Sequence, residues 1–114
     1  MIKLLLSAAL VLSTVSAQGQ TVISLDKSGT LSEKISNADK YNITSLKISG
    51  PLNGTDFILL RDMAGLDQDN NVSEGKLENL DLSDASIVKG GEPYYVSYKG
   101  SENVEYYTTD NEMS

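Results

Sequence analysis

The stretch "ITSLKISGPLNGTDF" (residues 43–57) decides the fold class of this chain. Its apolar residues Ile43, Leu46 and Ile48 are separated by polar ones, as in a strand with one buried face. Gly50-Pro51 follows as a turn signal and predicts the end of that strand. The pattern fits one strand of an ordinary small domain, and it equally fits one rung of a repeat.

A second copy of the frame favours the repeat. In "LENLDLSDASI" (residues 77–87), Leu77, Leu80 and Leu82 form an L-x-x-L-x-L frame that begins 34 residues after its counterpart. The apolar spacing between the two copies predicts a helix from about residue 55 to Gly65. Strand, helix, loop and strand in parallel register form one turn of a right-handed solenoid. We therefore expect an α/β fold, namely a short right-handed parallel β-solenoid of the leucine-rich-repeat type, with residues 43–89 as its strand-helix-strand unit.

Residues 1–17 have the features of a secretory signal peptide. Lys3 gives a positive start, a short apolar run follows, and small residues precede Gln18. The apolar run is shorter than the roughly 20 residues that a transmembrane helix needs. We therefore expect a secreted or cell-surface protein with no membrane insertion after signal cleavage.

Residues 18–42 are expected to form an N-terminal cap that closes one end of the solenoid. Residues 21–25 have the β-branched content of a short strand. A helix is predicted over residues 31–39, because Thr30 and Glu33 stand at the spacing of a capping box.

Residues 90–114 contain five of the six tyrosines. Arms at 94–98 and 104–108, joined by the turn-rich "KGSEN", predict a β-hairpin excursion. The chain then stops without a closing element, so this segment is expected to be truncated. The tyrosines either pack across the hairpin or form an aromatic surface for a partner, and both interpretations stay open. The residues concerned are Tyr94, Tyr95, Tyr98, Tyr106 and Tyr107.

The composition narrows the possible chemistry. The formal net charge is −7, and the loss of Lys3 with the signal peptide makes it more negative. Nucleic acids and anionic membranes bind clustered Lys and Arg, so neither is an expected partner. The chain contains no cysteine and no histidine, which excludes Cys/His zinc sites and nucleophiles activated by histidine. No cofactor is expected.

The loop "DQDNNVSEGKLE" (residues 67–78) is the strongest metal candidate. Its residues alternate as in a calcium-binding loop, and Glu78 stands where such a loop places its bidentate carboxylate. Val72 replaces the glycine that the sharp turn of a calcium loop needs. We therefore expect a solvated loop and no metal site. The alternating residues are Asp67, Asp69, Asn71 and Ser73.

Three carboxylates could serve a hydrolase, namely Glu78, Asp81 and Asp84. Glycoside hydrolysis needs two carboxyl groups about 5 to 10 Å apart across a cleft. In the repeat frame Glu78 and Asp81 occupy x positions and face solvent, so we expect no catalytic residue.

Two segments resemble a known family. "LKISGPLNGTDF" (residues 46–57) and "LDLSDASIV" (residues 80–88) are similar to the N-terminal part of BspA-like leucine-rich-repeat proteins, which are secreted or surface-displayed proteins of Bacteroidota-type bacteria. The resemblance extends over residues 24–114. It implies a parallel β-solenoid with a non-catalytic role in binding or adhesion. Members of the family continue into further repeats, so the resemblance also implies that this chain is an N-terminal fragment.

The leading hypothesis is an exported, non-enzymatic leucine-rich-repeat protein, or its N-terminal portion, that mediates protein binding or adhesion at the cell surface. The predicted partner contacts are the x positions of the two strands, which project from the concave face of a solenoid. They are Thr44, Ser45, Lys47, Glu78, Asn79 and Asp81. Two alternatives remain, a structural cap that shields the first repeat of a longer chain and an acidic secreted hydrolase that uses carboxylates alone. Buried acids in a cleft would favour the hydrolase, and exposed acids would favour the binding protein.

Overall fold

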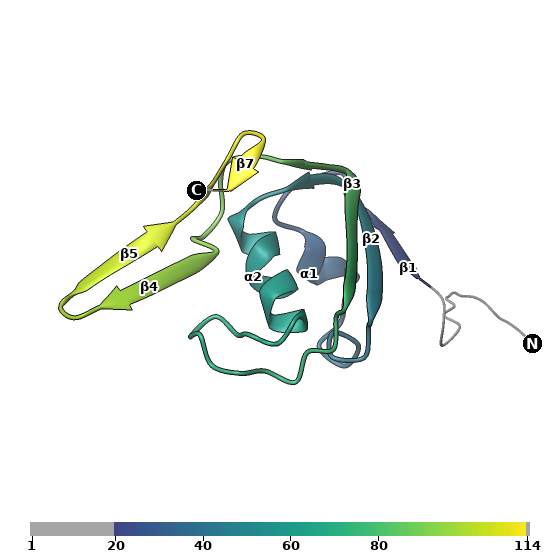
Figure 1. The fold of residues 1–114 in the computed structure, drawn as a ribbon. Helices are drawn as coiled ribbons and strands as arrows, with labels where there is room; N and C mark the ends of the chain where they lie inside the picture. The colour runs from purple at the N-terminus through teal and green to yellow at the C-terminus, as the bar shows by residue number, and fades with distance from the viewer. Residues whose placement is uncertain (1–19, 114) are drawn as a thin grey trace, which may run out of the picture.

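The computed structural model describes residues 20–113, so the predicted signal peptide at residues 1–17 lies outside the described part of the chain (Figure 1). In chain order the elements of the described part are β1 (Thr21–Ser24), α1 (Leu31–Lys34), β2 (Ser45–Leu52), α2 (Gly54–Met63), β3 (Asn79–Ile87), β4 (Tyr95–Lys99), β5 (Glu102–Tyr106), β6 (Thr108–Thr109) and β7 (Glu112–Met113).

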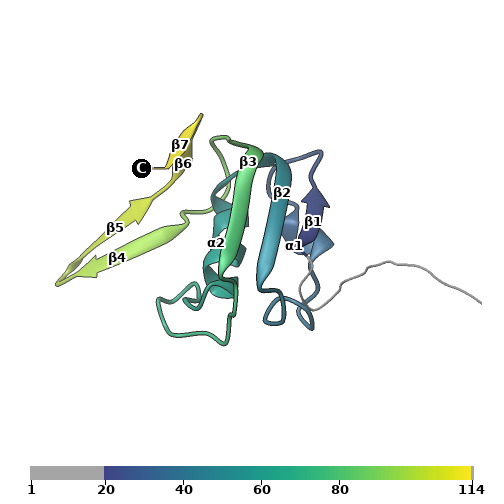
Figure 2. The same ribbon diagram turned by 45° about the vertical axis from the view of Figure 1, so that its right-hand side comes forward.

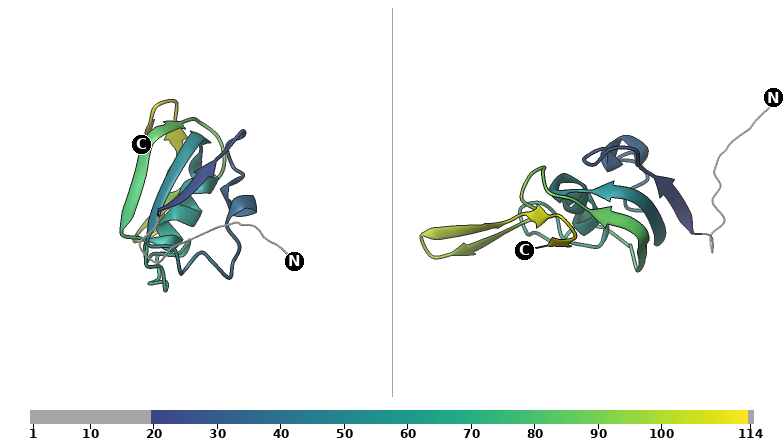
Figure 3. Two further views of the ribbon diagram at one scale, coloured as in Figure 1. Left: turned by 90° about the vertical axis from the view of Figure 1, so that its right-hand side faces the viewer. Right: turned by 90° about the horizontal axis from the view of Figure 1, so that it is seen from above.

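Strands β1, β2 and β3 form one parallel sheet with β2 in the centre. Both helices lie against the same face of this sheet, as Figures 2 and 3 show from three directions. Leu46 and Ile48 of β2 and Leu60 of α2 are buried between these two layers. Complete burial of one such side chain stabilises a fold by about 1.5–3 kcal/mol. In the described part of the chain, the hydrophobic core therefore lies on one side of the sheet only.

The predicted parallel pairing of the two leucine frames is confirmed, but the predicted solenoid is wrong. Leu46 of β2 pairs with Leu80 of β3 in parallel register. The connections that should repeat differ, because β1 leads to β2 through a four-residue helix and β2 leads to β3 through a ten-residue helix. After β3 the chain leaves the sheet and forms the antiparallel pairs β4–β5 and β6–β7. The fold is therefore a small compact α/β arrangement.

Strand β2 is longer than the sequence predicts, because it continues through Gly50 and Pro51 to Leu52. Gly50 has a φ of 102°, and a Cβ atom there would lie 2.1 Å from the Leu25 carbonyl oxygen, so only glycine fits. Backbone groups in a parallel strand alternate between its two neighbours, and the Ser49 carbonyl faces the β1 side, where it accepts the Leu25 N–H at 2.9 Å. The Pro51 nitrogen faces the same side, beyond the end of β1, so its missing N–H costs no ladder hydrogen bond.

Strand β3 contains a bulge that keeps its second half in phase with β2. Lys47 pairs with Asp81, and two residues later Ser49 pairs with Asp84, so β3 has one extra residue in between. Because of this extra residue, Ala85 packs against the core while Asp84 faces outward beside Ser49. A repeat frame without the bulge would turn Asp84 toward the core.

The N-terminal segment differs from the predicted cap in its helix. Helix α1 spans only Leu31–Lys34, because Ile35 adopts an extended conformation. The predicted capping box is also wrong, since the Thr30 hydroxyl donates to the Lys27 carbonyl at 2.7 Å and caps nothing. The next turn is closed by the Ser36 hydroxyl, which accepts the Asp39 N–H. Such side-chain bonds to the backbone compete with helix formation.

Helix α2 begins with a capping box at Asn53, just before the predicted start of the helix at about residue 55. The Asn53 side chain accepts the N–H groups of Thr55 and Asp56 at 3.0 and 3.4 Å, and the Asp56 carboxylate accepts the Asn53 N–H at 3.0 Å. The same carboxylate accepts the N–H groups of Gly29 at 2.7 Å and Leu31 at 3.0 Å. Asp56 is 1% exposed. One buried carboxylate thus joins the start of α2 to the chain that leads into α1.

The tyrosine-rich segment forms the predicted antiparallel hairpin, although its strands β4 and β5 are displaced by one or two residues from the predicted arms. This hairpin projects away from the sheet and helices (Figure 1). The residues after it fold back as the short pair β6–β7. The Asn111 N–H donates to the Ile87 carbonyl at 2.6 Å, and the Thr108 hydroxyl donates to the Val88 carbonyl at 2.7 Å. The tail therefore covers the carboxyl end of β3.

Replacement of Asp56 tests the role of its carboxylate. We expect Asp56→Ala to lower the free energy of unfolding by about 3 kcal/mol or more, because three backbone N–H groups lose a charged acceptor in a buried position. Asp56→Asn keeps one acceptor oxygen and should cost less. Urea unfolding followed by circular dichroism measures both. Asp26→Ala, at an exposed position, is the control. Equal stability of Asp56→Ala and the control would contradict this assignment.

Candidate functional site

The outer face of the parallel sheet carries the candidate site, and we name it the open face. Leu46 and Ile48 point into the core, so the alternate residues of β2 point to the opposite side. Their register partners on β1 and β3 share that side. None of these side chains is buried. The open face consists of Val22, Ser24, Ser45, Lys47, Ser49, Asn79, Asp81 and Asp84.

Hydrogen bonds and one ion pair order the open face. The hydroxyl groups of Ser24 and Ser49 lie 2.9 Å apart, and the Lys47 ammonium lies 3.1 Å from the Asp84 carboxylate. The hydrogen bond to Asp84 raises the pKa of Lys47, and the negative charges of Asp84 and Asp81 act in the same direction. Hydrogen bonds from the Ser83 hydroxyl and N–H lower the pKa of Asp81. Lys47 and Asp81 are therefore charged at neutral pH.

Four of the six predicted partner contacts lie together on the open face. Ser45 is the register partner of Asn79, and Lys47 is the register partner of Asp81. Thr44 and Glu78 lie just before their strands, where the Thr44 carbonyl accepts the Glu78 N–H at 2.9 Å. The sequence frame missed the contributions of β1 and Asp84 to this face. The β1 contribution could not be seen because residues 21–25 carry no leucine frame, and Asp84 is placed there by the bulge.

The carboxylates that a hydrolase would use do not face one another across a cleft. Asp84 pairs with Lys47, and Asp81 is held by Ser83 on the same strand. Glu78 and Asp84 are exposed. The two buried carboxylates of the described chain are Asp56 and Asp62 instead. Both belong to α2, and hydrogen-bond donors surround each of them.

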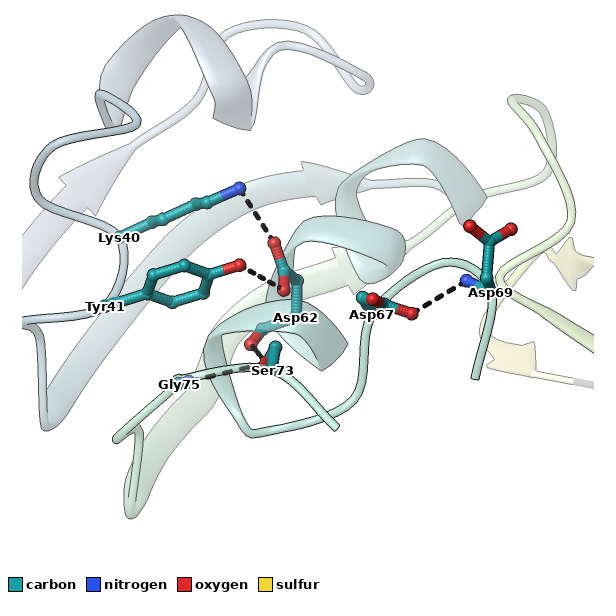
Figure 4. Close-up of polar contacts among 7 residues, drawn as sticks. All are labelled: Lys40, Tyr41, Asp62, Asp67, Asp69, Ser73 and Gly75. Atoms are coloured by element: carbon teal, nitrogen blue, oxygen red, sulfur yellow. Dashed lines mark hydrogen bonds and ion pairs between the residues drawn. The ribbon is translucent and has the colours of Figure 1, made fainter. Parts of the chain in front are cut away.

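Asp62 joins the loop before β2 to α2 (Figure 4). Its carboxylate lies 2.8 Å from the Lys40 ammonium and accepts the Tyr41 hydroxyl at 2.8 Å. Burial acts to raise the pKa of Asp62, but the hydrogen bonds from Lys40 and Tyr41 and the Lys40 charge outweigh it, so the pKa is lowered. The hydrogen bond to Asp62 raises the pKa of Lys40. This cluster is an ion pair that holds two segments together.

The loop that resembles a calcium site uses its polar groups internally. The Asp67 carboxylate accepts the N–H groups of Asp69 and Asn71, both at 2.9 Å, and the Asp69 side chain lies apart from it (Figure 4). The Ser73 hydroxyl donates to the Asp62 carbonyl. Within residues 20–113 no three acidic side chains gather where they could hold a metal ion.

The tyrosines of residues 90–114 divide into side chains that pack within the protein and side chains that are exposed. The Tyr94 ring packs edge-on against Phe57 with centroids 6.4 Å apart, and Tyr95 stacks on its cross-strand partner Tyr106 at 5.5 Å. Tyr98 is 59% exposed and Tyr107 is 42% exposed. The cross-strand packing interpretation therefore applies to Tyr95 and Tyr106, whereas Tyr98 and Tyr107 remain accessible to a partner.

Arg61 docks the hairpin on α2, a role that the sequence did not suggest. Its guanidinium donates to the Tyr94 carbonyl at 2.6 Å and to the Asn70 side chain at 3.2 Å. The guanidinium also lies 4.9 Å from the centre of the Tyr95 ring, a cation–π contact. The Asn70 amide in turn donates to the Val96 carbonyl at 2.8 Å. The β4–β5 hairpin is thus anchored to α2 at the end where its two strands enter and leave.

In comparisons with known proteins, no family model, no curated protein and no solved structure matches the chain. The resemblance to BspA-like proteins accordingly rests on the quoted sequence motifs alone. None of the helices in residues 20–113 is long and apolar enough to span a membrane.

The Lys40–Asp62 pair should make stability depend on pH. Because the pKa of Asp62 is lower in the folded state, its contribution is present above the unfolded-state pKa of about 3.9 and is lost as the pH falls through the folded-state pKa. We expect Lys40→Met to lower the free energy of unfolding by about 1–2 kcal/mol at pH 7 and by much less near pH 2. Urea unfolding at both pH values measures this difference. Lys34→Met, at an exposed position of α1, is the control. A pH-independent deficit would contradict the assignment.

Removal of the Arg61 guanidinium should release the hairpin without unfolding the sheet. We expect Arg61→Met to accelerate hydrogen exchange of the β4–β5 amides by about tenfold, because the docking hydrogen bonds and the cation–π contact are lost together. Amides of β2 should be unaffected. Hydrogen exchange read by NMR resolves the two groups. Lys76→Met, at an exposed position, is the control. Equal acceleration in both groups would mean that Arg61 supports the whole fold.

Proposed function

We propose that this protein is an exported, non-enzymatic binding module that recognises a protein partner at the cell surface through the open face. The proposal rests on one observation: in the described part of the chain, both helices lie on one face of the parallel sheet and the other face is left open (Figures 2 and 3). Parallel sheets almost always have both faces covered. Among residues 20–113 no helix or strand covers the polar face of this sheet, so the face is suited to contact a partner.

The order of the open face supports recognition. The Ser24–Ser49 and Lys47–Asp84 contacts restrict these side chains before any partner arrives. Side chains that are already ordered lose less conformational entropy on binding, which improves affinity. The backbone beneath them is fixed by the parallel ladder, so the spacing of the polar groups is constant.

The carboxyl groups favour binding over hydrolysis. A general acid that works near neutral pH needs a raised pKa, usually from burial. In the described chain, the aspartates with a resolved shift are Asp62 and Asp81, and the pKa of each is lowered. Exposed acids on the open face fit the binding protein better than the hydrolase.

Site-specific photo-crosslinking tests the proposal. A photoreactive amino acid at position 79 lies on the open face, and the same group at exposed position 37, after α1, serves as the matched control. We expect position 79, and not position 37, to cross-link one defined surface protein on intact cells. The introduction of Asp81→Lys, which reverses a charge on the open face, should reduce the yield. Equal cross-linking from both positions, or none from position 79, would count against the open face as the binding surface.

A further inference from the structure

We infer that the free edge of β3 binds an extended partner segment with alternating basic and apolar residues, which joins the sheet as a further strand. The inference rests on the proposed function, because it names the partner chemistry for the same sheet.

The backbone of β3 has an unpaired side. Within residues 20–113 the order of the sheet is β1-β2-β3, so no described strand pairs with the outer edge of β3. The Asn79 N–H donates toward β2, to the Thr44 carbonyl, and the Val88 N–H also donates toward β2. Alternation along the strand therefore turns the backbone groups of Leu80 and Ala85 away from β2. An added strand can hydrogen-bond to these groups.

The chain itself already uses one position of this edge. The Ile87 carbonyl faces away from β2 and accepts the Asn111 N–H at 2.6 Å. This bond demonstrates that the edge is accessible to a backbone donor. It also limits the available part of the edge to the residues before Ile87.

The charge of β3 selects the partner. Glu78, Asp81 and Asp84 are acidic, and no Lys or Arg lies between Lys76 and Lys89. Side chains of an added strand would lie directly beside Asp81 and Asp84 on the open face. Lys47 forms an ion pair with Asp84 at 3.1 Å, and the one lysine does not balance the three acids. Lysine or arginine at alternate positions of the partner would neutralise the excess negative charge.

The inner side of the same edge selects apolar residues. Leu80 points to the core side, like its register partner Leu46, but it is 40% exposed whereas Leu46 is fully buried. An apolar residue of the added strand would cover Leu80. Basic residues on one face and apolar residues on the other require strict alternation in the partner. A second copy of this chain is disfavoured, since its β3 would bring the same acidic residues against each other.

A synthetic peptide tests the inference directly. A lysine–valine alternating peptide of nine residues, the length of β3, is titrated into the purified protein at up to about 1 mM. We expect saturable binding and slower hydrogen exchange of the Leu80 and Ala85 amides. A peptide of identical composition with its lysines grouped at one end should bind much more weakly. Equal binding of the two peptides would overturn the inference, because charge alone would then explain it.

N-methylation of the peptide separates strand addition from other modes of binding. One peptide carries methyl groups on the lysine amides, and its matched partner carries them on the valine amides. Only one of these two sets can point toward β3, so only one peptide should lose binding. Loss in both or in neither would overturn the inference.

Variants of the protein locate the site. Asp81→Asn and Asp84→Asn should each weaken binding about two- to fivefold. Glu33→Gln, which removes the same charge from the exposed surface of α1, should not. Protection of the Leu80 and Ala85 amides without peptide, increasing with protein concentration, would assign the edge to a second copy and overturn the inference. If position 79 captures a partner and the alternating peptide does not bind, the edge inference fails while the proposed function stands.

Discussion

The buried carboxylate of Asp56 holds the two helices in their relative positions over the sheet. It accepts three backbone N–H groups, from Asn53 at the start of α2 and from Gly29 and Leu31 before and in α1. Helix α1 has only four residues and could not persist by its own hydrogen bonds. Asp56 fixes the backbone of Leu31, the first residue of α1, and the Leu31 side chain is fully buried in the core. The short first connection therefore works as a covering element for the sheet even though it is barely helical.

The one-sided arrangement of apolar residues has functional consequences. Strand β2 sends Leu46 and Ile48 to the helices and sends Ser45, Lys47 and Ser49 to solvent. Parallel strands that are covered on both faces usually read as continuous apolar runs, and β2 alternates instead. The polar face is thus built into the sequence of the central strand. The ion pair on this face depends on Asp84, which the bulge in β3 brings beside Lys47.

Elements defined by local spacing could be predicted from the sequence, and those defined by contacts between distant residues could not. The parallel pairing of the leucine frames, helix α2 and the tyrosine hairpin all follow from periodicity and turn residues. The solenoid prediction was wrong, because two copies of a strand frame do not indicate whether the chain segments that connect the strands are alike. The helix predicted at 31–39 failed because Ser36 and Asp39 close a turn of their own.

The site was predictable to a similar degree. Ser45, Lys47, Asn79 and Asp81 share a face because alternation along paired strands requires it. The place of Asp84 on the open face depends on one inserted residue, and the docking of the hairpin depends on Arg61 reaching a carbonyl 33 residues away in sequence. Neither leaves a periodic signal in the chain.

The proline in the central strand limits how far the first strand can extend along it. Pro51 has no hydrogen to offer a neighbour on the β1 side, so a lengthened first strand would meet an acceptor-only stretch there. The pairing of β1 with β2 is consequently bounded at this end, and β1 cannot shift its register forward along β2 without losing ladder hydrogen bonds.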